Sequence, residues 1–366
     1  MFKSKITTDQ VNYLNIALMI ISAASALMWP FETFLFVYAF LGPLHYLTEI
    51  SWLHDKKYFT SGKYDAIFLY VVGIIVTAVN FDLLPGLPQN TVPFITYLAF
   101  VAALLFVLFK KTSSRFIGIF IAIIVSNFFI HTKAFEAIFS VFLPTLIHVF
   151  LFTALFILVG ALRGRSFSGI LSLVIFAIVS IGLLYYHPSH SNYHVQDYVR
   201  SSYGYLKDNG SFTDGFIGLN HYIFTAFNLH DFGQPAAPFH DYVNNINDYI
   251  YHNPLALSIM SFIAFSYMYH YLNWFSKTSI IQWHNIPKWR FIGVIVLWVA
   301  SLALYAYNYS VGLKWLFLLS FTHVLVEFPL NHVTFINIGK EIGGIASGKP
   351  KASKQGKAVP SKIATK

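Results

Sequence analysis

Residues 11–29 read VNYLNIALMIISAASALMW and contain no charged side chain. An α-helix needs about 20 consecutive apolar residues to cross the hydrocarbon core of a bilayer. The stretch is too long for the core of a signal peptide, and no small-residue cleavage site follows it before the next apolar run. It therefore predicts a retained transmembrane helix.

Further apolar runs of similar length follow along the chain. They cover residues 31–50, 64–82, 93–110, 115–131, 135–160, 168–186, 255–275, 291–308 and 312–331. Of the 366 residues, 56% are hydrophobic and only 11% are charged, a balance far from that of a soluble domain. The sequence thus predicts an all-α fold, a polytopic membrane bundle of about ten transmembrane helices.

Lysine and arginine are distributed unevenly between the loops of this pattern. With the N-terminus inside, all basic residues fall in cytoplasmic segments except Lys133, Arg200, Lys207 and Lys314. Basic residues accumulate in cytoplasmic loops, so both termini are predicted to be cytoplasmic, as in a bacterial-type inner membrane. This topology also accounts for the net charge of +9, which therefore does not indicate a nucleic-acid partner.

The pattern divides the chain into four parts. Residues 1–186 hold the first seven helices, 187–254 an extracytoplasmic loop, 255–335 the last three helices, and 336–366 a basic tail predicted to be disordered. The long loop is expected to be a structured insertion. Within it, residues 215–229 favour an amphipathic or re-entrant helix, whereas the Asn-rich residues 244–253 favour turns.

Two apolar segments carry the same step of an imidazole followed by a carboxylate four residues later. His45 precedes Glu49, and His323 precedes Glu327. Residues four apart share one face of a helix, so each pair can present a nitrogen and an oxygen to one point. A carboxylate inside the hydrocarbon is costly, and this makes each pair a candidate functional site.

The predicted topology brings further histidines to the depth of these pairs. His270 lies near the cytoplasmic end of its helix, and His54, His284 and His332 lie at the same membrane face. We predict His45, Glu49, His270, His323 and Glu327 as metal ligands. His54, His284 and His332 are candidates for a second metal or for a shell of supporting residues.

The chain has no cysteine, so thiolate sites and iron–sulfur clusters are excluded. Imidazole and carboxylate ligands suit iron, with zinc or manganese less favoured. The prediction is a mono- or dinuclear iron centre in a membrane oxygenase. Its substrate would be an isoprenoid, carotenoid or acyl lipid entering from the bilayer among the membrane lipids, with an electron donor as a further partner.

Other interpretations of the same residues remain open. A proton- or cation-coupled transporter would use intramembrane histidines and glutamates as a relay. A non-catalytic membrane assembly factor would use the His–Glu pairs to hold its helices together. His148, in a middle helix, has no acidic residue nearby in the sequence and is not predicted as a ligand.

Three segments carry a resemblance to a known family. Residues 42–49 (GPLHYLTE), 267–270 (YMYH) and 322–327 (THVLVE) are similar to motifs of the Brp/Blh family of membrane carotene dioxygenases. The resemblance implies a polyhistidine non-haem iron site, which in that family cleaves β-carotene to retinal. It also makes His221 a weaker candidate ligand. Because the chain has Glu where the family usually has Asp, the resemblance supports the iron enzyme more than it supports carotene as the substrate.

Overall fold

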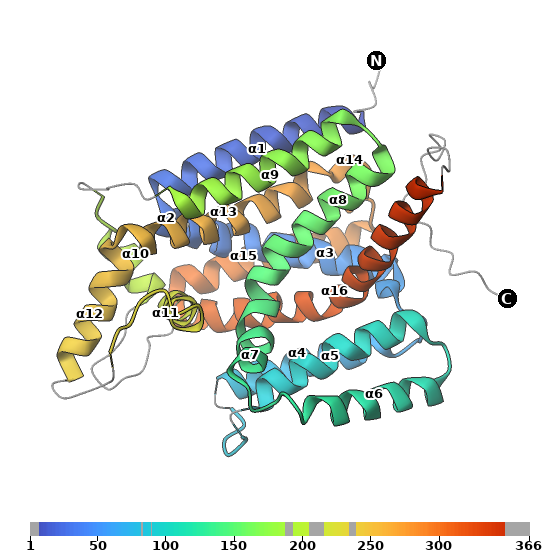
Figure 1. Ribbon diagram of the computed structural model, residues 1–366, viewed down its shortest axis with the longest axis horizontal. Coiled ribbons are helices and arrows are strands. Elements are labelled where there is room, and N and C mark those ends of the chain that lie inside the picture. Colours follow the sequence, from blue (N-terminus) through green and yellow to red (C-terminus); the bar gives the residue numbers. More distant parts are fainter. Residues whose placement is uncertain are drawn as a thin grey trace.

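The computed structural model describes residues 7–81, 83–88, 90–186, 193–204, 216–233 and 239–347. Within these segments the regular elements are helices, and none of the described residues forms a β-strand. The long helices lie side by side, and the start of α1 (Thr8–Met28) and the end of α16 (Tyr309–Ala346) lie at the same end of the bundle (Figure 1). We call this the terminal end.

The first half of the chain forms the following helices. They are α1 (Thr8–Met28), α2 (Pro30–Phe36), η1 (Val37–Leu41), α3 (Gly42–Asp55), η2 (Lys57–Phe59), α4 (Asp65–Asn80), α5 (Thr91–Leu108), α6 (Thr112–Ser126), α7 (Lys133–Glu136), η3 (Ala137–Phe152), α8 (Thr153–Gly164) and α9 (Phe167–Tyr185). The second half forms α10 (Asp197–Tyr203), α11 (Ile217–Ala226), α12 (Phe239–His252), α13 (Pro254–Ser276), α14 (Thr278–Ile281), α15 (Lys288–Tyr307) and α16 (Tyr309–Ala346).

Among the residues that the structure describes, seven helical segments are long and apolar enough to cross a membrane, which is compatible with an integral membrane protein. They are Thr8–Met28, Thr91–Leu108, Lys133–Gly164, Phe167–Tyr185, Pro254–Ser276, Lys288–Tyr307 and Val311–Ala346. The apolar helices α4 and α6 are shorter, and the predicted run 31–50 is divided among α2, η1 and α3. The all-helical prediction is confirmed for the described residues, while the count of ten spans stays a prediction.

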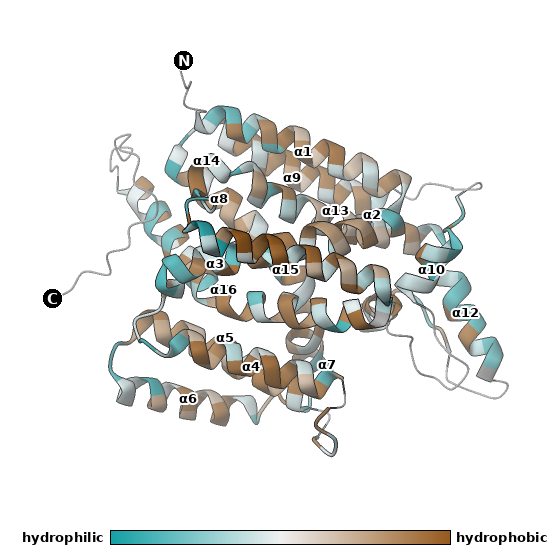
Figure 2. Ribbon diagram, turned by 180° about the vertical axis from the view of Figure 1, so that it is seen from behind, coloured by the Kyte–Doolittle hydropathy of each residue, from teal (hydrophilic) through white to brown (hydrophobic). Residues whose placement is uncertain are grey.

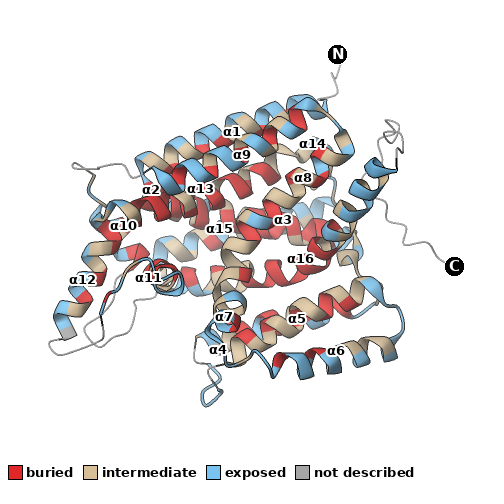
Figure 3. Ribbon diagram, in the orientation of Figure 1, coloured by how far each residue is buried: buried red, intermediate tan, exposed pale blue. Residues whose placement is uncertain are grey.

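Two helices form the centre of the bundle. In the most apolar window of α13, 83% of the residues are buried, and the figure is 61% in α16 but only 11% in α15. Buried residues concentrate on α13 and α16 (Figure 3), whereas hydrophilic residues gather mainly at the ends of the helices (Figure 2). Polar side chains in the middle of α13 and α16 are therefore shielded from lipid by the surrounding helices.

Two π-helical segments, η1 and η3, interrupt the regular helices next to candidate ligands. The η1 segment ends directly before Gly42 and Pro43, and Pro43, which has no N–H, interrupts the backbone hydrogen bonds where η1 continues into α3. The η3 segment contains Pro144, one turn before His148. π-helical turns are rare and are frequently found at functional sites.

The turns predicted for residues 244–253 are wrong, since residues 244–252 belong to the helix α12. Val243, Ile246 and Ile250 are buried at spacings of three and four residues, so one apolar stripe packs inward. Burial of this stripe outweighs the preference of the intervening asparagines for turns.

The predicted tail also begins later than residue 336, because α16 continues to Ala346. Each added residue extends an existing helix by one backbone hydrogen bond and needs no new nucleation. The last of these bonds in the described chain runs from the Ser347 N–H to the Gly343 carbonyl. Residues 348–366 lie outside the described residues.

A partly buried ion pair connects α4 to α6 at the terminal end. Asp65 accepts hydrogen bonds from Arg115 at 2.7 and 3.0 Å and from the Gly62 N–H at 2.7 Å. Asp65→Ala should lower the free energy of unfolding by about 2 kcal/mol, because a charged donor loses its partner. Thermal unfolding in detergent measures this loss. Glu341→Ala is the control, since it breaks a more exposed pair with Arg163 and should cost less than about 1 kcal/mol; equal losses would contradict the prediction.

Candidate metal centre

The first predicted pair, His45 and Glu49, lies one turn apart on the inner face of α3. The His45 Nε2 and Glu49 Oε2 atoms are 3.1 Å apart, and the residues are only 1% and 3% exposed. The helix geometry that the spacing predicts is therefore present, and both side chains point into the bundle.

His270 of α13 meets this pair from the opposite side. Its Nε2 lies 3.1 Å from the Nε2 of His45, and its Nδ1 shares a 2.7 Å hydrogen bond with the Thr153 hydroxyl. The hydroxyl fixes the orientation of the ring. Both Nε2 atoms therefore point to the same place between α3 and α13.

His323 of α16 adds a third imidazole, and its protonation state follows from its partner. Its Nδ1 lies 2.7 Å from the backbone carbonyl of Ser320, which can only accept a hydrogen bond. The proton must therefore be on Nδ1, and the Nε2 lone pair is left free for a metal. A backbone carbonyl that orients a histidine in this way is a common feature of metal ligands.

His148 of η3 completes the cluster together with the second predicted pair. Its Nε2 lies 3.1 Å from the Nε2 of His323 and 3.5 Å from Oε2 of Glu327. Both His148 and Glu327 are 1% exposed. Glu327 and Glu49 each approach the His323 Nε2 to 4.0 Å, so both carboxylates lie near this nitrogen.

We call these six residues the His–Glu cluster: His45, Glu49, His148, His270, His323 and Glu327. Two overlapping groups within it can hold a metal ion, and the ligand atoms of each lie within 4.8 Å of one another. One group is His45, His270 and His323, and the other is His148, His323 and Glu327. His323 belongs to both groups.

The spacing of the nitrogens fits a shared ion. Ligand atoms about 2.1 Å from a metal are about 3.0 Å apart at right angles and about 3.4 Å apart in a tetrahedron. Two imidazole pairs in the cluster have Nε2 atoms 3.1 Å apart. The charges fit as well, because no lysine or arginine in the described chain pairs with Glu49 or Glu327, and a divalent cation would balance two carboxylates.

The four imidazole rings differ in whether a hydrogen bond holds the Nδ1 atom. The Nδ1 atoms of His270 and His323 have hydrogen-bond partners, whereas those of His45 and His148 are buried with none among the described residues. Tyr46 stacks on His323 with ring centroids 4.5 Å apart, and its hydroxyl shares a 2.6 Å hydrogen bond with that of Tyr271. Tyr271 also packs against His45, with ring centroids 4.9 Å apart, so aromatic packing holds a ring whose Nδ1 has no hydrogen-bond partner among the described residues.

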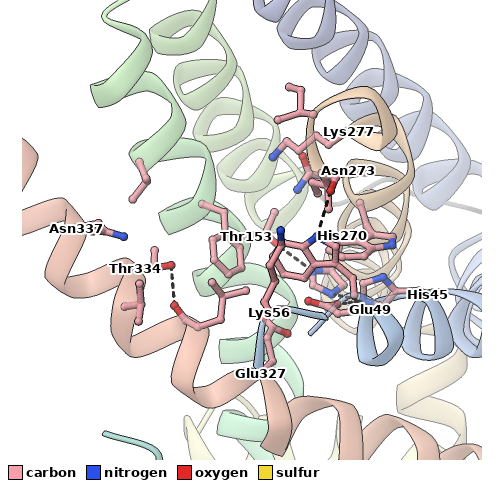
Figure 4. A pocket seen from close by; sticks show the side chains of 18 of the residues that line it. His45, Glu49, Lys56, Thr153, His270, Asn273, Lys277, Glu327, Thr334 and Asn337 are labelled. Atoms are coloured by element: carbon pink, nitrogen blue, oxygen red, sulfur yellow. Dashed lines mark hydrogen bonds and ion pairs between the residues drawn. The ribbon is translucent and has the colours of Figure 1, made fainter. Parts of the chain in front are cut away.

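A cavity of about 220 Å³ leads from the His–Glu cluster toward the terminal end of the bundle. Its lining includes His45, Glu49, His270 and Glu327, so four of the six cluster residues face it. Figure 4 shows His45, Glu49 and His270 close together at one part of this cavity, with Asn273 and Lys277 further along the same helix as His270. The His–Glu cluster is therefore accessible to a small molecule.

A second cavity of about 400 Å³ lies toward the other end of the bundle. It is lined by residues of α11, η3 and α16, among them Ser320, whose carbonyl accepts from His323. The cluster therefore lies between two cavities.

The structure does not bring the remaining predicted residues to the cluster. His54 and His284 are exposed, and the Nε2 of His332 donates to the Phe100 carbonyl at 2.9 Å, which ties α16 to α5. His221 lies in α11, outside the cluster, and burial lowers its pKa below the usual value. The predicted second metal or supporting shell is not formed by these histidines in the described chain.

His148 is the cluster residue that the sequence did not identify. Its acidic neighbour, Glu327, comes from a helix nearly 180 residues later, and the sequence around His148 has no carboxylate one turn away. The one local signal is Pro144, which marks an irregular helix four residues earlier.

Comparison with known proteins gave no match: no protein-family model, curated protein or solved structure is significantly similar to the chain.

Proposed function

We propose that this chain is an integral-membrane, metal-dependent oxidoreductase that uses iron and acts on a lipophilic substrate. The observation that supports the proposal most is the His–Glu cluster, in which four imidazoles and two carboxylates from four parts of the chain meet inside the bundle. A histidine used only for packing needs one hydrogen-bond partner. Here four Nε2 atoms point to one place, and most of them find no hydrogen-bond donor there, which a bound metal ion would replace.

The residues of the cluster have distinct roles in this proposal. His45, His270 and His323 bind the metal, and His148 and Glu327 bind the same ion or a second one. Glu49 is a ligand or accepts a proton beside His45. When bound, iron would supply the activation of dioxygen. The aromatic rings around the cluster exclude bulk water from the reacting atoms.

The test is metal analysis of the protein purified in detergent. Stoichiometric iron is expected in the unmodified chain, and His45→Ala and His270→Ala should each lose most of it. His54→Ala is the matched control, because this exposed histidine lies on the same helix as His45 and should retain the metal. Folded, monodisperse protein without metal would overturn the proposal.

A transporter is the second candidate, and the two cavities favour it. The cluster separates a cavity toward the terminal end from one toward the opposite end. Protons or cations crossing between them would meet the buried carboxylates, as in the relays of membrane carriers. Uptake of protons or cations by vesicles containing the purified protein, without bound iron, would support this candidate instead.

A further inference from the structure

Three cationic side chains line the cavity that leads from the His–Glu cluster to the terminal end. They are Lys56 of the α3 C-cap, Arg163 of α8 and Lys277 of the α13 C-cap. In two helices the cation follows a cluster residue by seven positions, Glu49 to Lys56 and His270 to Lys277. Seven residues are two turns of one helix face, or about 10.5 Å. Cluster and cations therefore lie at two levels of one cavity.

Between these levels the cavity wall is mostly apolar. Its side chains include those of Trp52, Phe156, Val159, Trp274, Leu330 and Val333. Asn273 is an exception, because it lines the cavity one turn before Lys277, is 7% exposed, and has a buried Oδ1 without a partner among the described residues. An unpaired buried amide is costly, and a polar ligand group at this level would satisfy it.

The cations are incompletely neutralised by the protein. Within the described residues, no carboxylate lies at ion-pair distance from Lys277, and burial lowers the pKa of its ammonium to about 8. Lys56 lies over the Trp52 ring at 5.8 Å, and Arg163 shares the carboxylate of Glu341. An anion bound at this level would replace the solvation that Lys277 loses on burial.

We propose that this cavity binds a single-chain amphiphile with an anionic headgroup, a carboxylate or a phosphate, held by Lys56 and Lys277. The chain lies along the apolar wall, and carbons about 10 Å from the headgroup reach the cluster. A volume of about 220 Å³ is below the roughly 300–1000 Å³ of pockets for drug-sized ligands, so one chain fits better than two. The assignment rests on the proposed function and names its substrate class: anionic amphiphiles rather than neutral hydrocarbons.

Binding is tested on full-length, metal-loaded protein in nanodiscs of neutral phosphatidylcholine. The probes are dodecanoate, dodecyl phosphate and dodecanol, which share one chain length, and Trp fluorescence reports binding because Trp52 and Trp274 line the cavity. Both anions should bind at least about tenfold more tightly than the alcohol. The tighter of the two identifies the headgroup. Equal binding of the alcohol would overturn the proposal.

Variants separate this site from general attraction to a charged surface. Lys277→Met should weaken binding of both anions at least about tenfold, whereas Lys277→Arg should retain it. Lys314→Met is the matched control, because Lys314 is exposed near the opposite end, over the Phe81 ring. Unchanged anion affinity in Lys277→Met, at unchanged metal content and thermal stability, would contradict the assignment.

The two proposals fail in different ways. Protein that contains iron but does not prefer the anions refutes the headgroup site and leaves the metal centre standing. Protein without iron that still binds the anions through Lys277 refutes the oxidoreductase and leaves the amphiphile site standing.

Discussion

A His323→Ala protein is expected to bind iron at least about 100-fold more weakly than the unmodified chain, the largest loss of any single substitution. His323 is the residue shared by both groups that can hold a metal, and its Nδ1–H···O=C bond to Ser320 leaves Nε2 free to coordinate. Changes to residues that only support a ligand already cost about 10–100-fold, so loss of the shared ligand should cost more. Equilibrium metal binding and metal content of the purified protein measure the effect.

His332→Ala provides the control for this substitution. His332 is also buried on α16, but its Nε2 donates to the Phe100 carbonyl instead of entering the cluster. The control should lose stability and keep its metal. If both variants lose iron equally, the metal is not bound through His323, or α16 as a whole has been disturbed.

Gly73→Leu is expected to damage both the fold and the metal centre. A Cβ atom at Gly73 would lie 2.8 Å from Oγ1 and 3.3 Å from Cα of Thr322, so α4 and α16 approach closely at this point. Overpacking of a tight contact costs about 1–3 kcal/mol, and the added chain must push α16 away. Because Thr322 precedes His323, the displacement should also lower metal affinity.

Thermal unfolding and metal content, measured on the same preparation, test this prediction. Gly293→Leu is the matched control, because a Cβ atom at Gly293 of α15 meets no other atom within 4 Å. It should change neither quantity. A Gly73→Leu protein with unchanged stability and full metal content would show that α4 does not determine the position of α16.

Hydropathy alone located the long helices, because a helix that crosses a bilayer needs about 20 consecutive apolar residues, and soluble proteins seldom contain such runs. Five of the six cluster residues could also be predicted. The pairs His45–Glu49 and His323–Glu327 each lie within one turn of a single helix, where sequence spacing fixes the geometry. His270 followed from its depth in the predicted topology.

His148 could not be found in this way, because the contact that reveals its role joins different helices. Its nearest cluster atoms belong to His323 and Glu327, and which face of η3 meets α16 is decided by packing. The prediction that the histidines at the membrane boundary join the cluster was wrong for a different reason. A shared predicted depth does not imply a shared position in the bundle, and His54 and His284 are exposed and lie outside the cluster.

The π-helical segments η1 and η3 make the cluster sensitive to chain length as well as to residue identity. A π-helical turn contains an extra residue relative to an α-helical turn, and each residue of an α-helix rotates the following side chains by about 100°. Deleting one residue from Ala137–Phe152 would rotate the side chains on one side of the deletion by about 100° relative to those on the other side, and so away from their present partners. A related protein that kept every histidine and glutamate of the cluster but lacked one residue of this segment would therefore have the ligand residues without the ligand geometry.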